Sequence, residues 1–576
     1  MLIEYKDREK TGEPFHPNHI LDNIYRRRGI SSMADLEYSL KNLLPPNFLG
    51  IEDAVKVLEE SLINDDRIMV VADYDCDGAT SCTVAVEGLR MFGFSDVRFM
   101  VPDRFTMGYG ISPTVVEHFK PHEPDLVVTV DNGISAFEGC EAVKNLEHKA
   151  KLLITDHHLG GDSVPVADAI VNPNQVGCPF PSKALAGCGV IFYVLLSFRS
   201  HLRKKGWFKE KGIPEPDLNK LLDVVALGTV ADVVPLDYNN RMLVWHGLKR
   251  INEGLARPGI QALASVSKIE TSKMTSTDFG FQLGPKINSA GRLGDMTIGI
   301  NCLLAETFEE AMKYAQELED LNVLRKQMTA EISTEATDQL DLPEETDRHG
   351  LCVFGDDFNE GIIGIVASRL KERYHRPIIV FTKAEDGAYK GSGRSVFGVH
   401  LRDILIQVDR RSEGRIMQKY GGHAMAAGMS INPEYFEEFQ QLFDEEVKKV
   451  LPTIEPVIET DGLLDVNDFN IETAVLIERS GPWGQQFLKP MFRGTFQLIE
   501  RRALKGAHLK MVLSPIGSDQ RIDAICFFCL ESEDALYPEG TVLQMVYELS
   551  INEYKGNVKL QLMVKDMRPT NEYQIL

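Results

Sequence analysis

The fold is decided by the stretch Val71-Ala72-Asp73-Tyr74-Asp75-Cys76-Asp77-Gly78-Ala79-Thr80-Ser81. It completes the apolar run 68–72, whose uninterrupted hydrophobic residues predict a strand buried on both faces of a sheet. Asp73, Asp75 and Asp77 alternate directly after this strand, so a turn of the chain brings three carboxylates near one point. Clustered negative charge is unfavourable unless cations neutralise it. The stretch therefore predicts a metal site at the end of a strand.

Further apolar runs lie on the C-terminal side of this stretch, separated by segments of helical character. They occupy residues 97–101, 126–130, 152–155 and 169–171. Continuous apolar strands that alternate with helices predict a parallel sheet covered on both faces, and ligands of such sheets bind beyond the carboxyl ends of the strands. Two of the runs lead into Asp131 and Asp156, as the first leads into Asp73. We expect these side chains to converge on one rim of the sheet.

Three other polar segments strengthen the case for a metal site. They are Asp131-Asn132-Gly133-Ile134-Ser135, Thr155-Asp156-His157-His158 and Gly228-Thr229-Val230-Ala231-Asp232-Val233. A single Asp at a strand end is usually a helix cap and adjacent histidines are usually surface residues, but four such sites within 160 residues are hard to attribute to capping. Mixed carboxylate and imidazole ligands suit Mn²⁺ or Mg²⁺. Two such ions can activate a water and hold both oxygens of a phosphoryl displacement.

A calcium-binding EF-hand is the alternative for the first stretch. That loop needs an acidic ligand at its twelfth position, where this chain has Val84, and it is flanked by two helices. Here a strand precedes the aspartates and a helix follows them, so the EF-hand alternative is disfavoured.

The remainder of the chain predicts several domains. We expect an N-terminal segment at 1–50, a parallel-sheet catalytic domain at 51–300, a connecting helix at 301–345, a second α/β domain at 346–452 and a small β-barrel at 453–576. Residues 300–342 contain neither glycine nor proline, and Thr307 with Glu310 has the spacing of a capping box. The last 120 residues alternate tightly between apolar and polar positions, as in a small β-barrel.

Composition predicts a soluble, cytoplasmic protein. The sequence has 43% hydrophobic residues, no apolar run long enough to cross a bilayer, an acidic start unlike a signal peptide, and nine cysteines, which favour a reducing compartment. A net charge of -23 argues against nucleic-acid binding when taken alone. The basic residues are grouped, however, at 26–28, 203–211, 410–419 and 501–510. A basic groove on an acidic protein is therefore an alternative that the net charge does not exclude.

The ordered set of motifs resembles the DHH phosphoesterase superfamily. Three downstream segments resemble the accessory half of its RecJ branch, the single-strand-specific 5′→3′ DNA exonucleases: Ala290-Gly291-Arg292-Leu293, Gly391-Ser392-Gly393-Arg394-Ser395 and Gly421-Gly422-His423-Ala424. The resemblance covers nearly the whole chain. It implies a DHH catalytic domain, a DHHA1-like second domain and a terminal OB-fold.

The resemblance also implies roles for particular residues. The implied metal ligands are Asp75, Asp77, Asp131, His157 and Asp232, and the implied catalytic residues are Asp73 and His158, the latter facing the scissile phosphate. The implied contacts to DNA and its 5′-terminal phosphate are Arg104, Tyr109, Arg292, Ser392, Arg394, Gly421, Gly422 and His423. For Tyr109, a buried core position is an open alternative. A glycine-rich loop with Ser392 and Arg394 independently suits phosphate, because amides and guanidinium can both reach its oxygens.

The leading hypothesis is a metal-dependent exodeoxyribonuclease of DNA recombination and repair that releases 5′-mononucleotides from single-stranded DNA. It implies two Mn²⁺ or Mg²⁺ ions as cofactors and, as protein partners, a single-strand-binding protein and a helicase. Two alternatives remain open. One is a DHH phosphodiesterase of dinucleotides or short RNA, and the other is an inactive scaffold of replication or repair.

Overall fold

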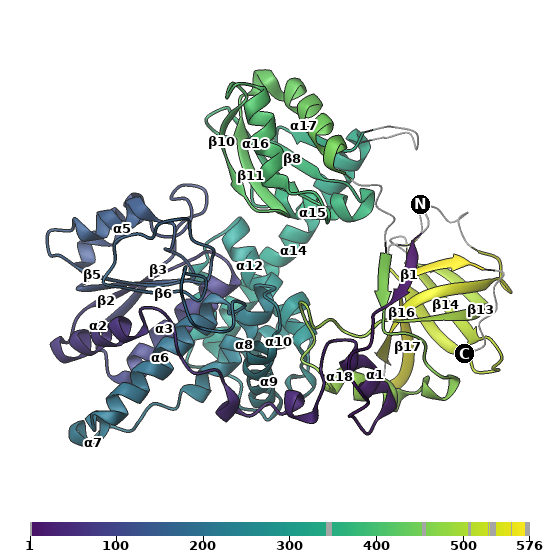
Figure 1. The fold of residues 1–576 in the computed structure, drawn as a ribbon, viewed down its shortest axis with the longest axis horizontal. Coiled ribbons are helices and arrows are strands. Elements are labelled where there is room, and N and C mark those ends of the chain that lie inside the picture. The colour runs from purple at the N-terminus through teal and green to yellow at the C-terminus, as the bar shows by residue number, and fades with distance from the viewer. Residues whose placement is uncertain are drawn as a thin grey trace. The chain divides into compact units, whose positions relative to one another are not determined.

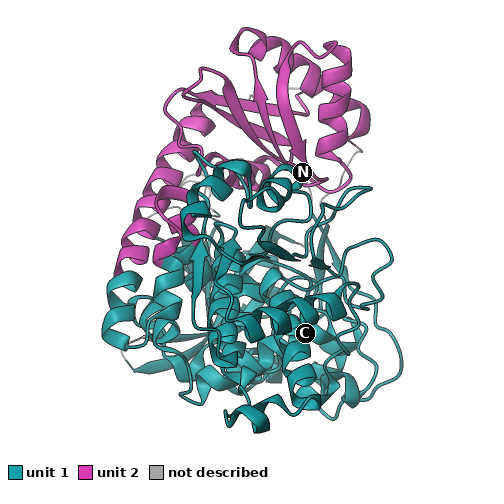
Figure 2. Ribbon diagram, turned by 90° about the vertical axis from the view of Figure 1, so that its left-hand side faces the viewer, with its two compact units in different colours: residues 1–287, 299–315, 455–576 teal, residues 288–298, 316–454 magenta. Residues whose placement is uncertain are grey.

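The computed structural model describes residues 3–340, 348–451, 457–504, 508–527, 529, 537–554 and 556–570. The chain divides into two compact units (Figures 1 and 2). The first unit comprises residues 1–287, 299–315 and 455–576, and the second comprises 288–298 and 316–454. The domain boundaries predicted above stay a prediction, whereas the α/β class, the parallel sheet and the terminal barrel are confirmed.

A five-stranded parallel sheet forms the core of the first unit. Its strand order is β3-β2-β4-β5-β6, with β2 at Ile68–Ala72, β3 at Val97–Met100, β4 at Leu126–Val130, β5 at Lys151–Thr155 and β6 at Ala169–Val171. All five coincide with the predicted apolar runs to within one residue. Every residue of β2 and β4 is buried, because helices cover both faces.

The helices on the two faces come from different parts of the chain. One face packs α4 (Pro113–Phe119) and α5 (Phe137–Lys144) through a core cluster that includes Val71, Val127 and Phe119. The other face packs α2 (Ile51–Asn64), α3 (Cys76–Phe92) and α6 (Gly187–Lys204). Further helices follow: α7 (Trp207–Lys211), α8 (Leu222–Ala231), α9 (Tyr238–Asn252), α10 (Pro258–Val266), α11 (Ser276–Asp278), the π-helical turn η6 (Phe279–Leu283), α12 (Gly284–Leu293) and α13 (Thr297–Leu304).

A long helix, α14 (Phe308–Gln339), continues from the first unit into the second. It begins later than the predicted 301–345 segment, because α13 ends at Leu304 and Thr307 starts the new helix by accepting a 3.2 Å hydrogen bond from the Glu310 amide. The Glu310 carboxylate reaches back to the amide of Glu306, not to that of Thr307. Thr307 therefore caps the helix as predicted, but the second hydrogen bond of the capping box goes to the Glu306 amide instead of the Thr307 amide.

The second unit is built on a mixed five-stranded sheet. Its order is β10-β11-β9-β8-β7, with β7 at Leu351–Gly355, β8 at Ile378–Lys383, β9 at Tyr389–Arg394, β10 at Met417–Gly422 and β11 at Ala426–Ile431. Only β7 and β8 pair in parallel. One face packs α15 (Ile363–Tyr374) with the end of α14, and the other packs α16 (Leu401–Arg411) and α17 (Phe436–Val450).

The C-terminal part of the first unit is a closed β-barrel. Its strand order is β13-β14-β15-β17-β16, with β13 at Phe492–Leu504, β14 at His508–Pro515, β15 at Ile522–Cys526, β16 at Val542–Tyr554 and β17 at Asn557–Pro569. Helix α18 (Ile471–Arg479) lies beside it. The tight alternation of apolar and polar positions is the pattern that a small barrel requires, because one face of each strand fills the interior.

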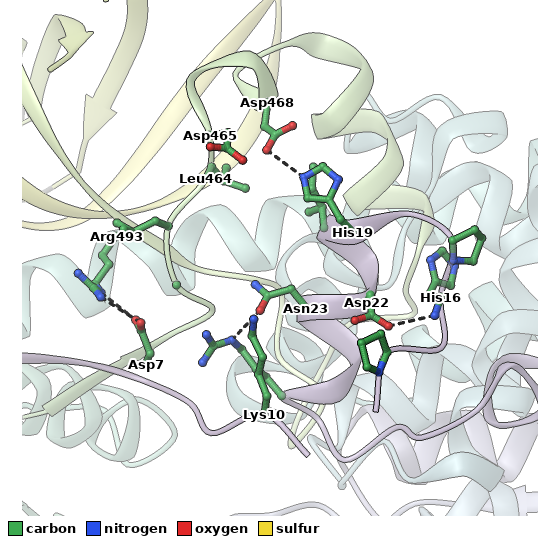
Figure 3. Close-up of a pocket in the computed structure, with 16 residues that line it drawn as sticks. Asp7, Lys10, His16, His19, Asp22, Asn23, Leu464, Asp465, Asp468 and Arg493 are labelled. Atoms are coloured by element: carbon green, nitrogen blue, oxygen red, sulfur yellow. Dashed lines mark hydrogen bonds and ion pairs between the residues drawn. The ribbon is translucent and has the colours of Figure 1, made fainter. Parts of the chain in front are cut away.

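The N-terminal segment is joined to the barrel region. Strand β1 (Glu4–Asp7) pairs in parallel with β12 (Val457–Thr460), and helix α1 (His19–Arg26) lies beside it (Figure 3). A cavity of about 570 Å³ opens at this junction, and Asp7 in its wall pairs with Arg493 at 2.8 Å. Arg28 forms a 2.6 Å ion pair with the buried Asp461 nearby. Because the ion pair between Asp7 and Arg493 joins the N-terminal segment to the barrel region in the wall of this cavity, we interpret the cavity as part of a structural junction.

Candidate active site

The acidic residues after the parallel strands are positioned by the ends of those strands and by helix caps. Asp75 caps α3, where its Oδ1 accepts a 3.0 Å hydrogen bond from the Gly78 amide. Asp77 lies in the first turn of α3 and accepts hydrogen bonds from the amides of Gly187 (2.5 Å) and Cys188 (3.1 Å) at the start of α6. The N-terminus of α6 therefore points its amides at Asp77 and holds that carboxylate in place.

Seven of the predicted residues meet at one place. Ligand atoms lie within 4.8 Å of one another in each of three groups, which are Asp131 with His157 and His158, Asp77 with His157 and Asp232, and Asp73 with Asp75 and Asp131. Asp131 and His157 each belong to two groups, so the groups form one continuous cluster. The expectation that these side chains, far apart in sequence, converge on one rim of the sheet agrees with this arrangement.

Three atoms at the centre of the cluster are buried without a hydrogen-bond partner among the described residues. They are Asp131 Oδ1, His157 Nε2 and Asp232 Oδ2. His157 Nε2 lies 3.1 Å from Asp131 Oδ1 and 3.5 Å from Asp232 Oδ2, yet the three atoms form no hydrogen bond. A buried polar atom without a partner costs about 1–3 kcal/mol. Divalent cations would satisfy all three atoms, so the donor set fits a metal centre.

The electrostatics of the cluster lead to the same conclusion. Burial, and after it repulsion between neighbouring carboxylates, raises the pKa of Asp73, Asp131 and Asp232 well above the ordinary value. The pKa of Asp75 is raised for the same two reasons. Bound cations would offset both effects and favour the ionised carboxylates. The electrostatics of the site thus suit cations.

Asp156 orients His158. Its Oδ1 lies 2.8 Å from His158 Nδ1 and also accepts hydrogen bonds from the amides of His157 and His158. Burial lowers the pKa of His158, but the hydrogen bond and charge of Asp156 outweigh it and raise that pKa to about 9. The imidazole therefore points its Nε2 away from Asp156, and 42% of the side chain remains exposed to a ligand.

Two asparagines that were not predicted hold the backbone of the two histidines. Asn174 Nδ2 donates to the carbonyl of His157 at 2.6 Å, and Asn172 Nδ2 donates to the carbonyl of His158 at 2.9 Å. Both follow β6, the last strand of the sheet. A signal was present in the Asn172-Pro173-Asn174 turn, since asparagines in such turns often bind neighbouring backbone groups.

Tyr109 and Arg104 lie beside the cluster. The Tyr109 hydroxyl donates to the Asp131 carbonyl at 3.3 Å and lies 3.4 Å from His158 Nε2. Because 48% of Tyr109 is exposed, the core alternative for this residue is wrong. The Arg104 guanidinium stacks over the Tyr74 ring at 4.1 Å, which keeps a positive charge next to the first aspartate stretch.

A second set of predicted residues assembles inside the second unit. Ser392 and Arg394 project from the same face of β9, and Arg394 Nη1 donates to Ser392 Oγ at 3.2 Å. A β-carbon at Gly364 would lie 2.9 Å from both Ser392 Oγ and Arg394 Nη2. Arg292 is held by a 2.9 Å hydrogen bond to the Gly361 carbonyl, just before α15. These residues surround the N-terminal end of that helix, where backbone amides favour anions.

Arg394 is poised for an anion. Burial lowers its pKa, and the hydrogen bonds found for its guanidinium go to neutral acceptors, namely the Ser392 hydroxyl and the Gly393 carbonyl. A largely buried cation without a carboxylate is unfavourable, and a phosphate oxygen would compensate it.

A row of glycines lies beside these residues on the same sheet. Ser392 pairs with Gly428 on β11, and Gly428 pairs with Gly421 on β10, so the three residues share one face of the sheet. A β-carbon at Gly421 or Gly428 would meet open space. Gly422 and His423 end the row, with the His423 amide donating to the Ala426 carbonyl. The bare backbone leaves room for a ligand to approach the sheet.

Most of the basic groups noted in the sequence are neutralised within the protein. Arg28 pairs with Asp461, Arg203 with Glu215, and Arg411 with Glu446. The group on β13 and β14 differs, because Arg502 lies directly opposite Lys510 on neighbouring strands of the barrel. Like charges side by side repel unless an anion lies between them.

Comparisons with known proteins match the three parts of the chain. Family models match as the DHH family N-terminal domain over residues 67–229, the DHHA1 domain over 348–449 and the RecJ OB domain over 460–566. The chain is also similar over its whole length to a solved structure of RecJ from Thermus thermophilus in complex with Mn²⁺, with a TM-score of 0.78, 24% identity, and coverage of 99% of this chain and 80% of that one. At that identity the likeness establishes the fold. A second structure, of an exonuclease RecJ bound to manganese, matches with a TM-score of 0.57 and 29% identity over 70% of this chain and 95% of that one.

Two curated proteins named single-stranded-DNA-specific exonuclease RecJ are much more similar in sequence. The protein from Salmonella typhimurium is 44% identical over 98% of this chain and 99% of its own, and the protein from Escherichia coli is 44% identical over 96% of both. Identity at this level over almost the full length of both chains, together with the three matched domain models, shows that the chain belongs to the RecJ family of the DHH phosphoesterases.

Proposed function

We propose that the protein is a metal-dependent exonuclease that degrades single-stranded DNA from its 5′ end and releases 5′-mononucleotides. The observation that carries the proposal is the set of three buried, unpartnered ligand atoms on Asp131, His157 and Asp232. Family membership supports the reaction class, because the relatives compared above are named exonucleases specific for single-stranded DNA.

The cluster would hold two Mn²⁺ or Mg²⁺ ions. The residues assigned as ligands are Asp75, Asp77, Asp131, His157 and Asp232, with Asp73 beside them. When bound, such ions supply an activated water and neutralise charge on the phosphate being cleaved. The chain keeps the ligands in place through the α6 amides on Asp77 and the asparagine bonds behind His157. His158, held by Asp156, presents its Nε2 to a non-bridging phosphate oxygen.

The group of residues around the start of α15 in the second unit would hold the 5′-terminal phosphate. Ser392, Arg394 and Arg292 supply a hydroxyl and two guanidinium groups, and Gly421, Gly422 and His423 would line the path of the nucleotide. The hydrogen bonds of the Arg394 guanidinium go to neutral acceptors, which supports this assignment, since phosphate accepts bidentate hydrogen bonds from arginine. Arg104 and Tyr109 would guide the strand past the metal cluster, and the barrel would bind the strand through its basic strands β13 and β14.

The cellular setting is part of the same proposal. An enzyme of this kind acts in DNA recombination and repair, where a helicase exposes single strands and a single-strand-binding protein covers them. We place it in the cytoplasm on account of its nine cysteines, which are thiols and mostly buried. Among the described residues no helix is long and apolar enough to cross a membrane.

The proposal is tested with single-stranded substrates labelled at either end, in the presence of Mn²⁺. We expect labelled mononucleotides to appear at once from the 5′-labelled strand, no digestion of blunt duplex, and loss of activity in excess chelator. A dinucleotide should be cleaved much more slowly than a long strand. Degradation that begins at 3′ ends, or a dinucleotide cleaved as fast as a long strand, would overturn the proposal.

A further inference from the structure

A phenylalanine of the first unit is exposed in a way that packing does not explain. Phe281 leaves 76% of its surface in contact with solvent, whereas Phe279, two residues before it, is fully buried. Both belong to the π-helical turn η6 (Phe279–Leu283), in which the Gly284 amide donates to the Phe279 carbonyl five residues back. Such wide turns are rare inside helices and frequently lie at functional sites. Residues two apart lie on opposite sides of a helix, so Phe281 points away from the side that buries Phe279.

Two glycines position this turn. A β-carbon at Gly284 would lie 3.0 Å from the Ala231 β-carbon and 2.9 Å from the Phe279 carbonyl oxygen, so a larger residue would displace the helix. A β-carbon at Gly280 would lie 3.6 Å from Val230 Cγ1. The Gly280-Phe281-Gln282-Leu283-Gly284 segment therefore packs its backbone directly onto the end of α8.

The end of α8 carries a member of the metal cluster. Asp232 follows Ala231, the last residue of that helix, as its C-cap, and Val233 beyond it is 61% exposed with a φ of 62°. From the packing of Gly284 on Ala231, the Cα atoms of Phe281 and Asp232 lie within roughly 15 Å of each other. The exposed ring of Phe281 and the exposed Val233 thus lie on the surface at a distance from the cluster that a strand of a few nucleotides can span.

We propose that Phe281 is a stacking platform for a nucleobase of the strand that is cleaved at the metal cluster. The inference rests on the proposed function, because it takes a single strand of nucleic acid as the occupant. The cluster binds a phosphodiester through charge and cannot recognise a base, so an apolar ring beside it supplies the missing contact. Stacking on phenylalanine accepts every base, as an exonuclease that degrades any sequence requires.

The platform predicts a specific interaction between Phe281 and the base. The test is a double-mutant cycle that compares a normal single strand with strands in which the first, second or third nucleotide from the 5′ end is abasic. Wild type and the variants Phe281→Ala and Phe281→Trp are measured by kcat/KM for the first cleavage in Mn²⁺. Phe308→Ala, which removes a 39% exposed phenylalanine at the start of α14, is the matched control.

We expect wild type to lose about 5- to 150-fold in kcat/KM on the strand that is abasic at the stacked position, the range that base stacking on aromatic side chains supports. Phe281→Ala should lose the same factor on the normal strand and nothing further on the abasic one, because the two changes remove one contact. Phe281→Trp should restore the penalty for the abasic strand, and Phe308→Ala should keep the wild-type penalty.

The inference fails if Phe281→Ala shows the same abasic penalty as wild type, since the ring then contacts something other than a base, such as a protein partner. A wild-type protein that cleaves neither strand would instead remove the proposed function itself. The two failures are distinguishable because only the second abolishes metal-dependent degradation of the normal strand. Unchanged thermal unfolding of Phe281→Ala excludes a purely structural effect.

Discussion

Replacing Gly187 by alanine adds one methyl group at the point where α6 touches the metal cluster. The new β-carbon would lie 2.6 Å from the Asp131 β-carbon and 2.7 Å from Asp131 Oδ1. Carbon atoms in contact prefer about 3.5–4.0 Å, so either Asp131 or α6 must move by about 1 Å. A displacement of that size at a catalytic group lowers the rate by about 100-fold. We expect that loss in Mn²⁺-dependent degradation of single-stranded DNA.

The control is Gly189→Ala on the same helix. Its β-carbon would meet only the end of the Leu185 side chain, at 3.0 Å, and that side chain can turn aside. We expect activity near that of wild type for this variant and thermal unfolding close to wild type for both. Gly187→Ala with activity within twofold of wild type would refute the reasoning, because the chemistry would then not depend on the position of Asp131.

Three further predictions test other parts of the structure. Arg394→Ala should reduce the preference for 5′-phosphorylated over 5′-hydroxyl strands by about 10- to 150-fold, the factor for a lost charge-assisted contact of about 1.5–3 kcal/mol, and an unchanged ratio of the two rates would contradict the proposed phosphate site. Hydrogen bonds from Arg67 lower the pKa of Asp125, so this pair stabilises the fold above the unfolded pKa near 4 and loses that effect as pH falls through the folded value. The free energies of unfolding of Asp125→Asn and wild type should therefore differ at pH 7, and the difference should shrink as the pH falls below 4. A difference that grew in acid would contradict this sign. Thr307→Ala should destabilise the start of α14 by about 1 kcal/mol, measured as faster amide exchange there, whereas exchange in α15 should not change.

Much of the catalytic rim could be predicted from sequence because it depends on local rules. Asp73, Asp131 and Asp156 each follow an apolar run, and the carboxyl ends of parallel strands lie at one edge of a sheet. Those two facts place the side chains together without any knowledge of side-chain contacts. The barrel and the second sheet were predictable for the same reason, since period and strand length are local properties.

What could not be predicted depends on contacts between distant segments. Nothing near Gly187 indicates that its amide will bind Asp77, 110 residues away, or that its missing side chain makes room for Asp131. Asp156 was recognised as part of a motif, but its function as the acceptor that orients His158 follows only from the fold. The π-helical turn at Phe281 is equally hidden, because its sequence is compatible with an ordinary helix.

The central claim is that five acidic and imidazole side chains from distant parts of the chain hold a pair of divalent cations. Anomalous scattering from a manganese-soaked crystal, collected at the manganese edge, tests it most directly. The account predicts two strong peaks among Asp75, Asp77, Asp131, His157 and Asp232, within a few ångströms of each other. A single weak peak elsewhere, or a map without peaks at this rim, would contradict it.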